Sequence, residues 1–246
     1  NKKGVDAGLQ EMMIWSLTAG AELCKILNEP ATVKNSEDAI SKLRKNIPDA
    51  NHSKQAAALM ALTGLMPAGQ ANKDILSVGG THNFSTFYGY YMLKAKALAG
   101  DYQGAIDAIR EYWGAMLHLG ATTFWEDFNL DWLPNASGID ALPLPGQKDI
   151  HGDYGAYCYV GFRHSLCHGW ASGPTPWLTE NVLGIQVLSP GCKVIKVTPH
   201  LGDLSFAEGT FPTPFGVVKV KHIKQADGKI TTTINAPKEI KVIRAN

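Results

Sequence analysis

The strongest constraint on the fold is a pair of amphipathic segments joined by a two-residue turn. Residues 84–99 place apolar side chains at helical spacing, and residues 102–118 repeat this pattern after Gly100-Asp101. A glycine that ends one helix, followed at once by an aspartate that can cap the next, is typical of a tight antiparallel αα-hairpin. We therefore expect repeated helical hairpins with bulky inner faces, as in a bundle, a solenoid or an α/α toroid.

Further helices are expected on both sides of this hairpin. Their expected ranges are 6–28, 36–47 with Ser36 as a possible cap, 53–63, about 72–78, and Pro174 to Leu183. No residue pattern recurs at a fixed period, so the sequence does not support a known short helical repeat. The first two-thirds of the chain are thus predicted to be mainly helical.

The chain changes to strand-like patterns after Pro190-Gly191. Residues 193–198 and 217–224 alternate apolar and polar side chains, which is typical of half-buried strands. Asp227-Gly228 is a hairpin signal, and two further strand-like runs at 230–234 and 240–244 follow it. We expect a helical domain over residues 1–189 and a small antiparallel β-sandwich module over residues 190–246.

Charge and hydropathy exclude several classes of function. The 246 residues carry 23 basic and 22 acidic side chains, so no large basic field is available to bind nucleic acid. No run of 18 apolar residues is present, so we expect no membrane span. The four cysteines, at positions 24, 158, 167 and 192, match no zinc or redox spacing. Glycine-rich nucleotide motifs and the GxSxG nucleophile motif are also absent.

The candidate chemistry lies in an irregular segment, residues 121–172, which is rich in Trp, His and Asp. Glu126 stands there among Phe124, Trp125 and other aromatic residues. Partial desolvation by such neighbours is one way to tune a carboxylate for acid–base work, and aromatic faces beside carboxylates suit sugars. The alternative is an ordinary helix start, with Glu126 and Asp127 as first-turn acids.

A second motif, Arg163 to Trp170, has three possible interpretations. His164 and His168 are four residues apart, which on a helix could hold zinc, but no Glu occupies the place that a HExxH motif requires. Cys167 beside His168 could suggest a thiol nucleophile, although adjacency in sequence does not bring two side chains together. A histidine that hydrogen-bonds a ligand, or a structural histidine, is favoured. We expect neither a metal nor a cofactor.

Several spaced motifs, taken in order, resemble bacterial α-L-rhamnosidases. They are the TTFWE turn at 122–126, the SLCHGW segment at 165–170, PWL at 176–178, NVLGI at 181–185, and the closing IKVTP and TPFG segments at 195–199 and 213–216. The resemblance runs over nearly the whole chain. It implies a catalytic (α/α)6 toroid followed by a β-sandwich.

The resemblance also implies hydrolysis of terminal α-L-rhamnosides with inversion by two carboxyl groups. By this likeness Glu126 is the general base, His168 contacts the sugar, and Trp125 forms a wall of the rhamnose subsite. The family usually has Asn before this histidine, whereas Cys167 stands there here. The substrate would be a rhamnose-containing oligosaccharide or glycoside, and the likeness suggests a periplasmic or secreted enzyme.

One feature of the family is missing from the sequence. The family's general acid lies in an Asp-, Arg- and Trp-rich stretch that residues 1–80 lack, and fewer helices are expected than the twelve of a toroid. We therefore expect the C-terminal part of such an enzyme, with the acid upstream and a possible dimer covering the incomplete toroid. The alternatives are a non-catalytic glycan-binding or assembly fragment and a toroid glycosidase for another sugar. The presence of one Arg, Arg163, in the irregular segment argues mildly against an acidic sugar.

Overall fold

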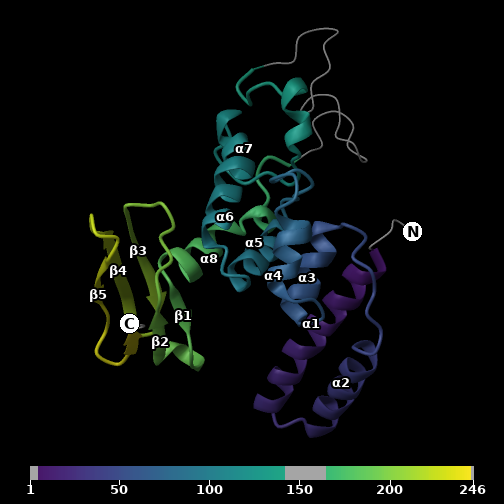
Figure 1. Cartoon of the computed structure of the whole chain (residues 1–246). Helices are drawn as coiled ribbons and strands as arrows, with labels where there is room; N and C mark the ends of the chain where they lie inside the picture. The colour runs from purple at the N-terminus through teal and green to yellow at the C-terminus, as the bar shows by residue number, and fades with distance from the viewer. Residues whose placement is uncertain (1–4, 142–164, 245–246) are drawn as a thin grey trace.

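Helices fill most of the chain before residue 184 and strands follow, in a computed structural model that describes residues 5–141 and 165–244 (Figure 1). The α-helices are α1 (Val5–Ile26), α2 (Pro30–Leu43), α3 (Lys54–Thr63), α4 (Ala68–Ala71), α5 (Gly89–Leu98), α6 (Tyr102–Ala108), α7 (Gly114–His118) and α8 (Pro174–Trp177). Three π-helical turns are η1 (Asn72–Leu76), η2 (Ile109–Trp113) and η5 (Leu178–Val182). Three 3-10 turns are η3 (Leu130–Asn135), η4 (Gly169–Ala171) and η6 (Pro190–Cys192).

The hairpin that the sequence predicts is present between α5 and α6. Gly100 has a φ of +80°, which glycine adopts without the penalty that a Cβ brings. The Asp101 carboxylate then accepts a hydrogen bond of 2.9 Å from the main-chain amide of Gly104 and so caps α6. The expected helix over 102–118 is formed by α6, η2 and α7 in succession.

Two helix starts differ from the expectation. The predicted helix at 36–47 begins earlier, at Pro30, and Glu29 rather than Ser36 precedes its first turn. Proline fits the first turn of a helix because no amide hydrogen is needed there, so Pro30 can begin α2 shortly after α1 ends at Ile26. The helix predicted from residue 84 starts instead at Gly89, because the preceding residues form turns, one closed by the Tyr88 amide donating to Ser85 Oγ.

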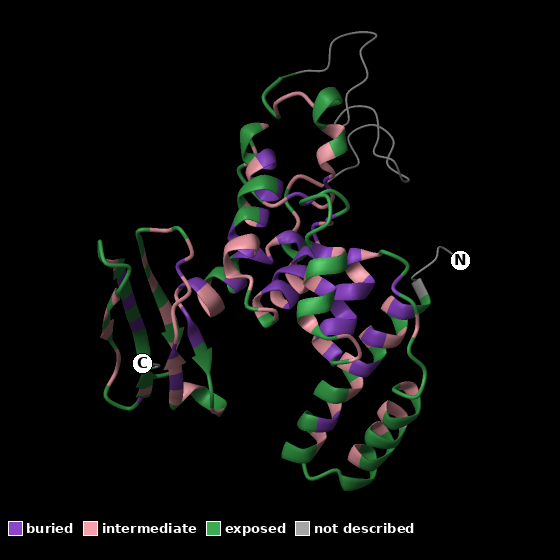
Figure 2. Cartoon of the chain, viewed as in Figure 1, coloured by how far each residue is buried: buried purple, intermediate pink, exposed green. Residues whose placement is uncertain are grey.

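The main core lies where α3, α5 and the α6–η2–α7 run meet, and Figure 2 shows buried residues concentrated there. Its largest fully buried side chains include Trp125, Trp177, Tyr112, Phe128 and Met92. The α1–α2 pair differs from this core, since α2 has no buried residue and Leu9 and Ile26 of α1 are 66% and 74% exposed. The expectation that a second copy covers such a face remains a prediction.

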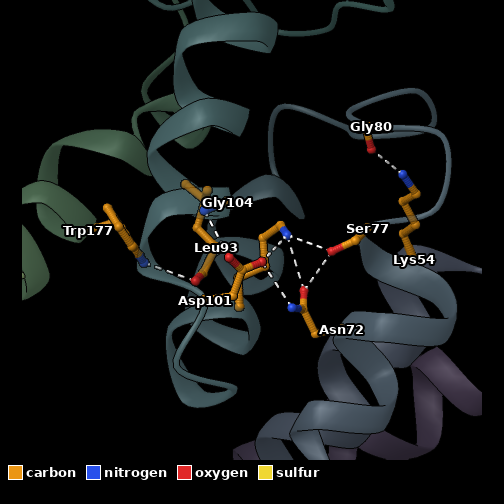
Figure 3. Close-up of polar contacts among 9 residues, drawn as sticks. Lys54, Asn72, Ser77, Gly80, Leu93, Asp101, Gly104 and Trp177 are labelled. Carbon is orange, nitrogen blue, oxygen red and sulfur yellow. Dashed lines mark hydrogen bonds and ion pairs between the residues drawn. The ribbon is translucent and has the colours of Figure 1, made fainter. Parts of the chain in front are cut away.

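A buried lysine ties the hairpin to η1. Lys96 of α5 donates hydrogen bonds to Asp101 (2.7 Å), Ser77 Oγ (2.9 Å) and Asn72 Oδ1 (3.1 Å). Asn72 in turn donates to Asp101 over 2.9 Å, and Figure 3 draws the contact between these two side chains. These four residues are called the Lys96 cluster below. All three ammonium protons therefore have acceptors, which is the condition under which a buried lysine is tolerated.

The strands form two three-stranded sheets that share a core. They are β1 (Ile185–Val187), β2 (Val194–Val197), β3 (Phe206–Thr213), β4 (Gly216–Lys224), β5 (Ile230–Asn235) and β6 (Lys241–Arg244). One sheet has the order β1-β2-β6 and the other the order β3-β4-β5. Ile195 and Val197 of the first sheet pack with Val218 and Val220 of the second, which makes a small sandwich. The β2–β6 pair is parallel, so the expected all-antiparallel pattern is wrong at this one pairing.

Two strands were not expected. β1 is three residues long and lies before residue 190, where the second domain is expected to begin. This domain boundary remains a prediction. β3 contains Gly209 and Pro212, residue types that disfavour strands in general. Pro212 is tolerated because β3 is an edge strand. Glycine suits position 209 because any other residue would place a Cβ 2.4 Å from Leu183 Cδ1.

The helical region and the sheets are joined by direct contacts. Arg110 of η2 makes two hydrogen bonds of 2.7 and 2.8 Å to the Asp203 carboxylate. Tyr102 of α6 stacks on His200, with ring centroids 3.5 Å apart and planes 5° from parallel. Among the described helices, none combines the length and the apolar character that crossing a membrane requires.

Candidate functional site

The TTFWE and SLCHGW motifs, about forty residues apart in the sequence, lie side by side. The Glu126 amide donates to the Ser165 carbonyl over 2.8 Å, and the His168 amide donates to the Phe124 carbonyl over 2.7 Å. Both bonds join main-chain atoms, so they align the two segments whether or not a ligand is bound. The structure thus brings the predicted base and the predicted sugar-contacting histidine into one region.

Glu126 is half-buried and is held by two other parts of the chain, the 165–170 segment and the turn that contains Thr86. Its Oε2 accepts a hydrogen bond of 3.0 Å from the Ser165 amide. Its main-chain carbonyl accepts from Thr86 Oγ1 over 2.5 Å and from Trp170 Nε1 over 2.6 Å. A half-buried carboxylate with a defined position is what acid–base chemistry requires.

His168 and Trp170 form one end of a row of aromatic rings. The ring centroids of His168 and Trp170 are 4.6 Å apart, and Trp170 lies 5.6 Å from Phe87. Phe87 contacts Tyr91, which contacts Trp15 edge-on at 6.0 Å. Trp170 is 49% exposed, so part of its ring is open to a ligand. Apolar ring faces of this kind fit the C–H faces of sugars.

Trp125, the predicted subsite wall, lies in the core. Its side chain is 0% exposed, and its ring packs edge-on against Phe128 at a centroid distance of 5.9 Å. Its role toward a sugar stays a prediction. In this structure, the exposed aromatic surface next to Glu126 comes instead from Trp170.

Sequence reasoning missed Trp170, Thr86 and Phe87 as parts of the site. Trp170 belongs to the motif that carries the family resemblance, two residues after His168, and that position was a usable signal. Phe87 was assigned to a helix face, whereas it lies in the turns before α5. Thr86 carries no local signal, because its contact with Glu126 spans forty residues of sequence.

Asp127, next to Glu126, has an altered acidity. Burial raises the pKa of the Asp127 carboxyl above its usual value. The Phe128 amide, which donates to Asp127 Oδ1 over 2.9 Å, opposes this rise, and the negative charge of Glu126 adds to it. Two neighbouring carboxylates therefore share a partly desolvated environment, as in many acid–base sites.

Only some of the residues expected at a zinc or thiol site lie in the described part of the chain. Arg163, His164 and Cys158 lie outside the described residues, so the zinc pair of His164 and His168 is not described. Over 5–141 and 165–244, no three His, Cys, Asp or Glu side chains gather as a metal site would require. Cys24, Cys167 and Cys192 are present as free thiols, with Cys167 exposed.

A wide cleft lies away from Glu126 and His168. This cleft of about 940 Å³ lies between the helical region and the sheets, with Lys94, Tyr102, Glu180 and Phe211 in its lining. A smaller, apolar cavity of about 270 Å³ touches Thr123 and Phe124. Glu126 and His168 line neither cavity, and the chemistry argues for the half-exposed surface around these two residues as the candidate site.

The chain is similar in sequence to a known enzyme. An α-L-rhamnosidase from Alteromonas sp. (strain LOR) is 30% identical over 120 residues, which cover 47% of this chain and 10% of that protein. The chain resembles α-L-rhamnosidases. The resemblance drawn from the spaced motifs is therefore confirmed. No protein-family model matches the chain.

Solved structures of α-L-rhamnosidases share the fold. The enzyme from Aspergillus terreus superposes with a TM-score of 0.75 at 18% identity, over 94% of this chain and 27% of that one. The GH78 family rhamnosidase of Bacillus sp. GL1 gives 0.72 at 22% identity, over 94% and 25%. The Streptomyces avermitilis enzyme, solved with L-rhamnose, gives 0.70 at 16%, over 95% and 22%. The expected helical toroid segment followed by a β domain is confirmed, and the chain spans about a quarter of these proteins.

Proposed function

We propose that this chain forms part of a glycoside hydrolase that cleaves terminal α-L-rhamnosides with inversion, with Glu126 as the general base. The observation that carries the proposal is the main-chain pairing that places Glu126 beside the segment of His168 and Trp170. Similarity to α-L-rhamnosidases in sequence and fold supports the substrate class.

The reaction assigns a defined task to each group. An ionised Glu126 takes a proton from water, and that water attacks the anomeric carbon from the face opposite the leaving group. The carbon–oxygen bond to the aglycone breaks, and a general acid protonates the leaving oxygen. We propose that this acid lies upstream of residue 1. Inverting enzymes keep the two carboxyl groups about 6.5–9.5 Å apart to leave room for the water.

His168 and Trp170 are proposed to bind the sugar. The imidazole can hydrogen-bond a hydroxyl, and the half-exposed indole can pack against a C–H face. Because Cys167 stands where an asparagine is usual in the family, one polar contact to the sugar would be absent or supplied by another group. Trp125, buried beneath this surface, would act through packing.

The experiment is an assay of the full natural protein with aryl α-L-rhamnosides. We expect steady release of the phenol and a product that first appears as β-L-rhamnose, seen by NMR before mutarotation. Matched aryl glycosides of α-L-fucose and α-D-mannose serve as controls for the sugar. Faster turnover of either control would favour a toroid glycosidase for another sugar. Rhamnose binding without turnover would favour the glycan-binding alternative.

A further inference from the structure

The main-chain carbonyl of Glu126 carries two side-chain hydrogen bonds from different parts of the chain. Thr86 Oγ1, in the turns before α5, donates over 2.5 Å, and Trp170 Nε1, in η4, donates over 2.6 Å. A carbonyl oxygen has two lone pairs, and each of these donors can take one. The Glu126 amide is also bonded, to the Ser165 carbonyl. Both main-chain groups of this residue are thus fixed from outside its own segment.

Fixing the main chain of Glu126 fixes the origin and direction of its carboxylate. The Cα–Cβ bond is set by the peptide planes on either side, so a change in these planes would move the carboxylate relative to the attacked carbon. A displacement of about 1 Å can cost roughly 100-fold in rate. The carboxylate itself accepts a hydrogen bond from the Ser165 amide, and this bond limits rotation about the side-chain bonds of Glu126.

Trp170 also connects Glu126 to the histidine. Its ring lies 4.6 Å from that of His168 and 5.6 Å from that of Phe87, the neighbour of Thr86. Two segments therefore hold Glu126 and His168 in one arrangement. They are the loop of Thr86 and Phe87 and the turn that contains His168 and Trp170.

Comparison with two other tryptophans separates this role from ordinary packing. Trp113 Nε1 donates to the Ala171 carbonyl over 3.1 Å, and Trp177 Nε1 donates to the Leu93 carbonyl over 3.0 Å. Both rings are buried, at 5% and 0% exposure, so they contribute mainly to the core. Trp170 makes the same kind of bond but is 49% exposed, so burial of its ring contributes less to the stability of the fold.

We infer that Trp170 and Thr86 are positioning residues for Glu126, and that they hold its carboxylate in place through the main-chain carbonyl. This inference rests on the proposed function of Glu126. Thr86 is 2% exposed and so acts on the reaction through Glu126 rather than by touching the sugar. Loss of either hydrogen bond lowers kcat, and KM stays nearly unchanged as long as residue 170 keeps an aromatic ring for the sugar.

The experiment measures kcat, KM and thermal stability of two variants of the full natural protein with an aryl α-L-rhamnoside. Trp170→Phe keeps an aromatic ring and removes the N–H, and we expect kcat to fall about 10- to 100-fold with KM within about 3-fold. Thr86→Val keeps the shape and removes the hydroxyl donor, and we expect a smaller fall in kcat. Thr86→Ser restores the donor and should return kcat toward the wild-type value.

Matched controls remove the same kind of bond elsewhere. Trp177→Phe removes an indole donor to a main-chain carbonyl, and Thr179→Val removes the hydroxyl bond to the Thr175 carbonyl over 3.1 Å. We expect Trp177→Phe to lower thermal stability at least as much as Trp170→Phe, and Thr179→Val, which removes an exposed bond, to change it little, with kcat of the folded protein unchanged in both.

The outcomes separate this inference from the proposed function. An active wild type in which Trp170→Phe and Thr86→Val have the kcat of the controls overturns the inference alone. A fall in kcat that Thr86→Ser does not reverse also overturns it. An inactive wild type, or a Glu126→Gln variant with normal turnover, overturns the proposed function and the inference with it.

Discussion

Two aspartates in the helical region have pKa values shifted in opposite directions. Burial by itself raises the pKa of Asp101, but the hydrogen bonds from Lys96 and Asn72 and the charge of Lys96 outweigh it, so the pKa lies below its usual value. Burial also raises the pKa of Asp127, and there the charge of Glu126 adds to the effect. Asp101 belongs to the Lys96 cluster (Figure 3), and Asp127 belongs to the candidate site.

The charges that meet in each place distinguish a structural polar cluster from a functional one. In the Lys96 cluster, opposite charges meet and every lysine proton has an acceptor, so removing the lysine would leave its buried partners unpaired and destabilise the fold. In the candidate site, two carboxylates are neighbours and an aromatic ring is half-exposed beside them. Such an arrangement costs stability and is retained in proteins mainly where it has a function.

The largest expected effect is on catalysis. Glu126→Gln in the full natural protein keeps the shape of the side chain and removes its basicity. We expect kcat to fall about 10²- to 10⁴-fold, because that is the usual contribution of general acid–base catalysis. Thermal stability should change little, in contrast to variants in the Lys96 cluster. Steady-state kinetics measure the fall in kcat, and a melting curve measures the thermal stability.

The next effect is on folding. Lys96→Met removes the buried partner of Asp101, and we expect a loss of about 3 kcal/mol in the free energy of unfolding, with kcat of the folded protein unchanged. Lys94→Met, on the same helix, is the matched control. Lys94 pairs with Glu180 at 3.7 Å with both side chains partly exposed, so its loss should cost below about 1 kcal/mol. Equal losses in urea unfolding would contradict the distinction between the two lysines.

The smallest effect is a pH dependence at Asp127. Because the pKa of Asp127 is raised in the folded state, the folded protein binds more protons there than the unfolded chain as the pH rises from about 4. The contribution of Asp127 to the free energy of unfolding therefore decreases as the pH rises over this window. In Asp127→Asn, this decrease should be smaller, with the exposed Asp74→Asn as the control for removing one carboxylate. An identical pH dependence in wild type and Asp127→Asn would argue against the shift.

Local sequence signals were sufficient for much of the fold. Gly100-Asp101 predicted the α5–α6 turn because both residues act within a few positions of themselves. The start of α2 was misplaced because Pro30 suits both the end of one helix and the first turn of another. β3 was missed because the features that permit Gly209 and Pro212, an edge position and contact with Leu183, are tertiary.

The candidate site was predicted in part for the same reason. Glu126 and His168 could be proposed from the sequence because they lie in recognisable motifs, and the structure brings their segments together, while their roles stay predictions. Thr86 could not be found, since its contact with Glu126 depends on how the turns before α5 pack against residues 124–126. Burial of Trp125 likewise depends on packing against Phe128, which sequence spacing does not specify.

The most direct test of the role of Glu126 is azide rescue of Glu126→Ala in the full natural protein. Removing the side chain leaves space for azide on the face where water would attack. If Glu126 is the base, we expect very slow turnover of an aryl α-L-rhamnoside without azide, and faster turnover with azide that yields β-L-rhamnosyl azide. Turnover of Glu126→Ala near the wild-type rate without azide, or an α-configured azide product, would contradict the assignment of Glu126 as the base.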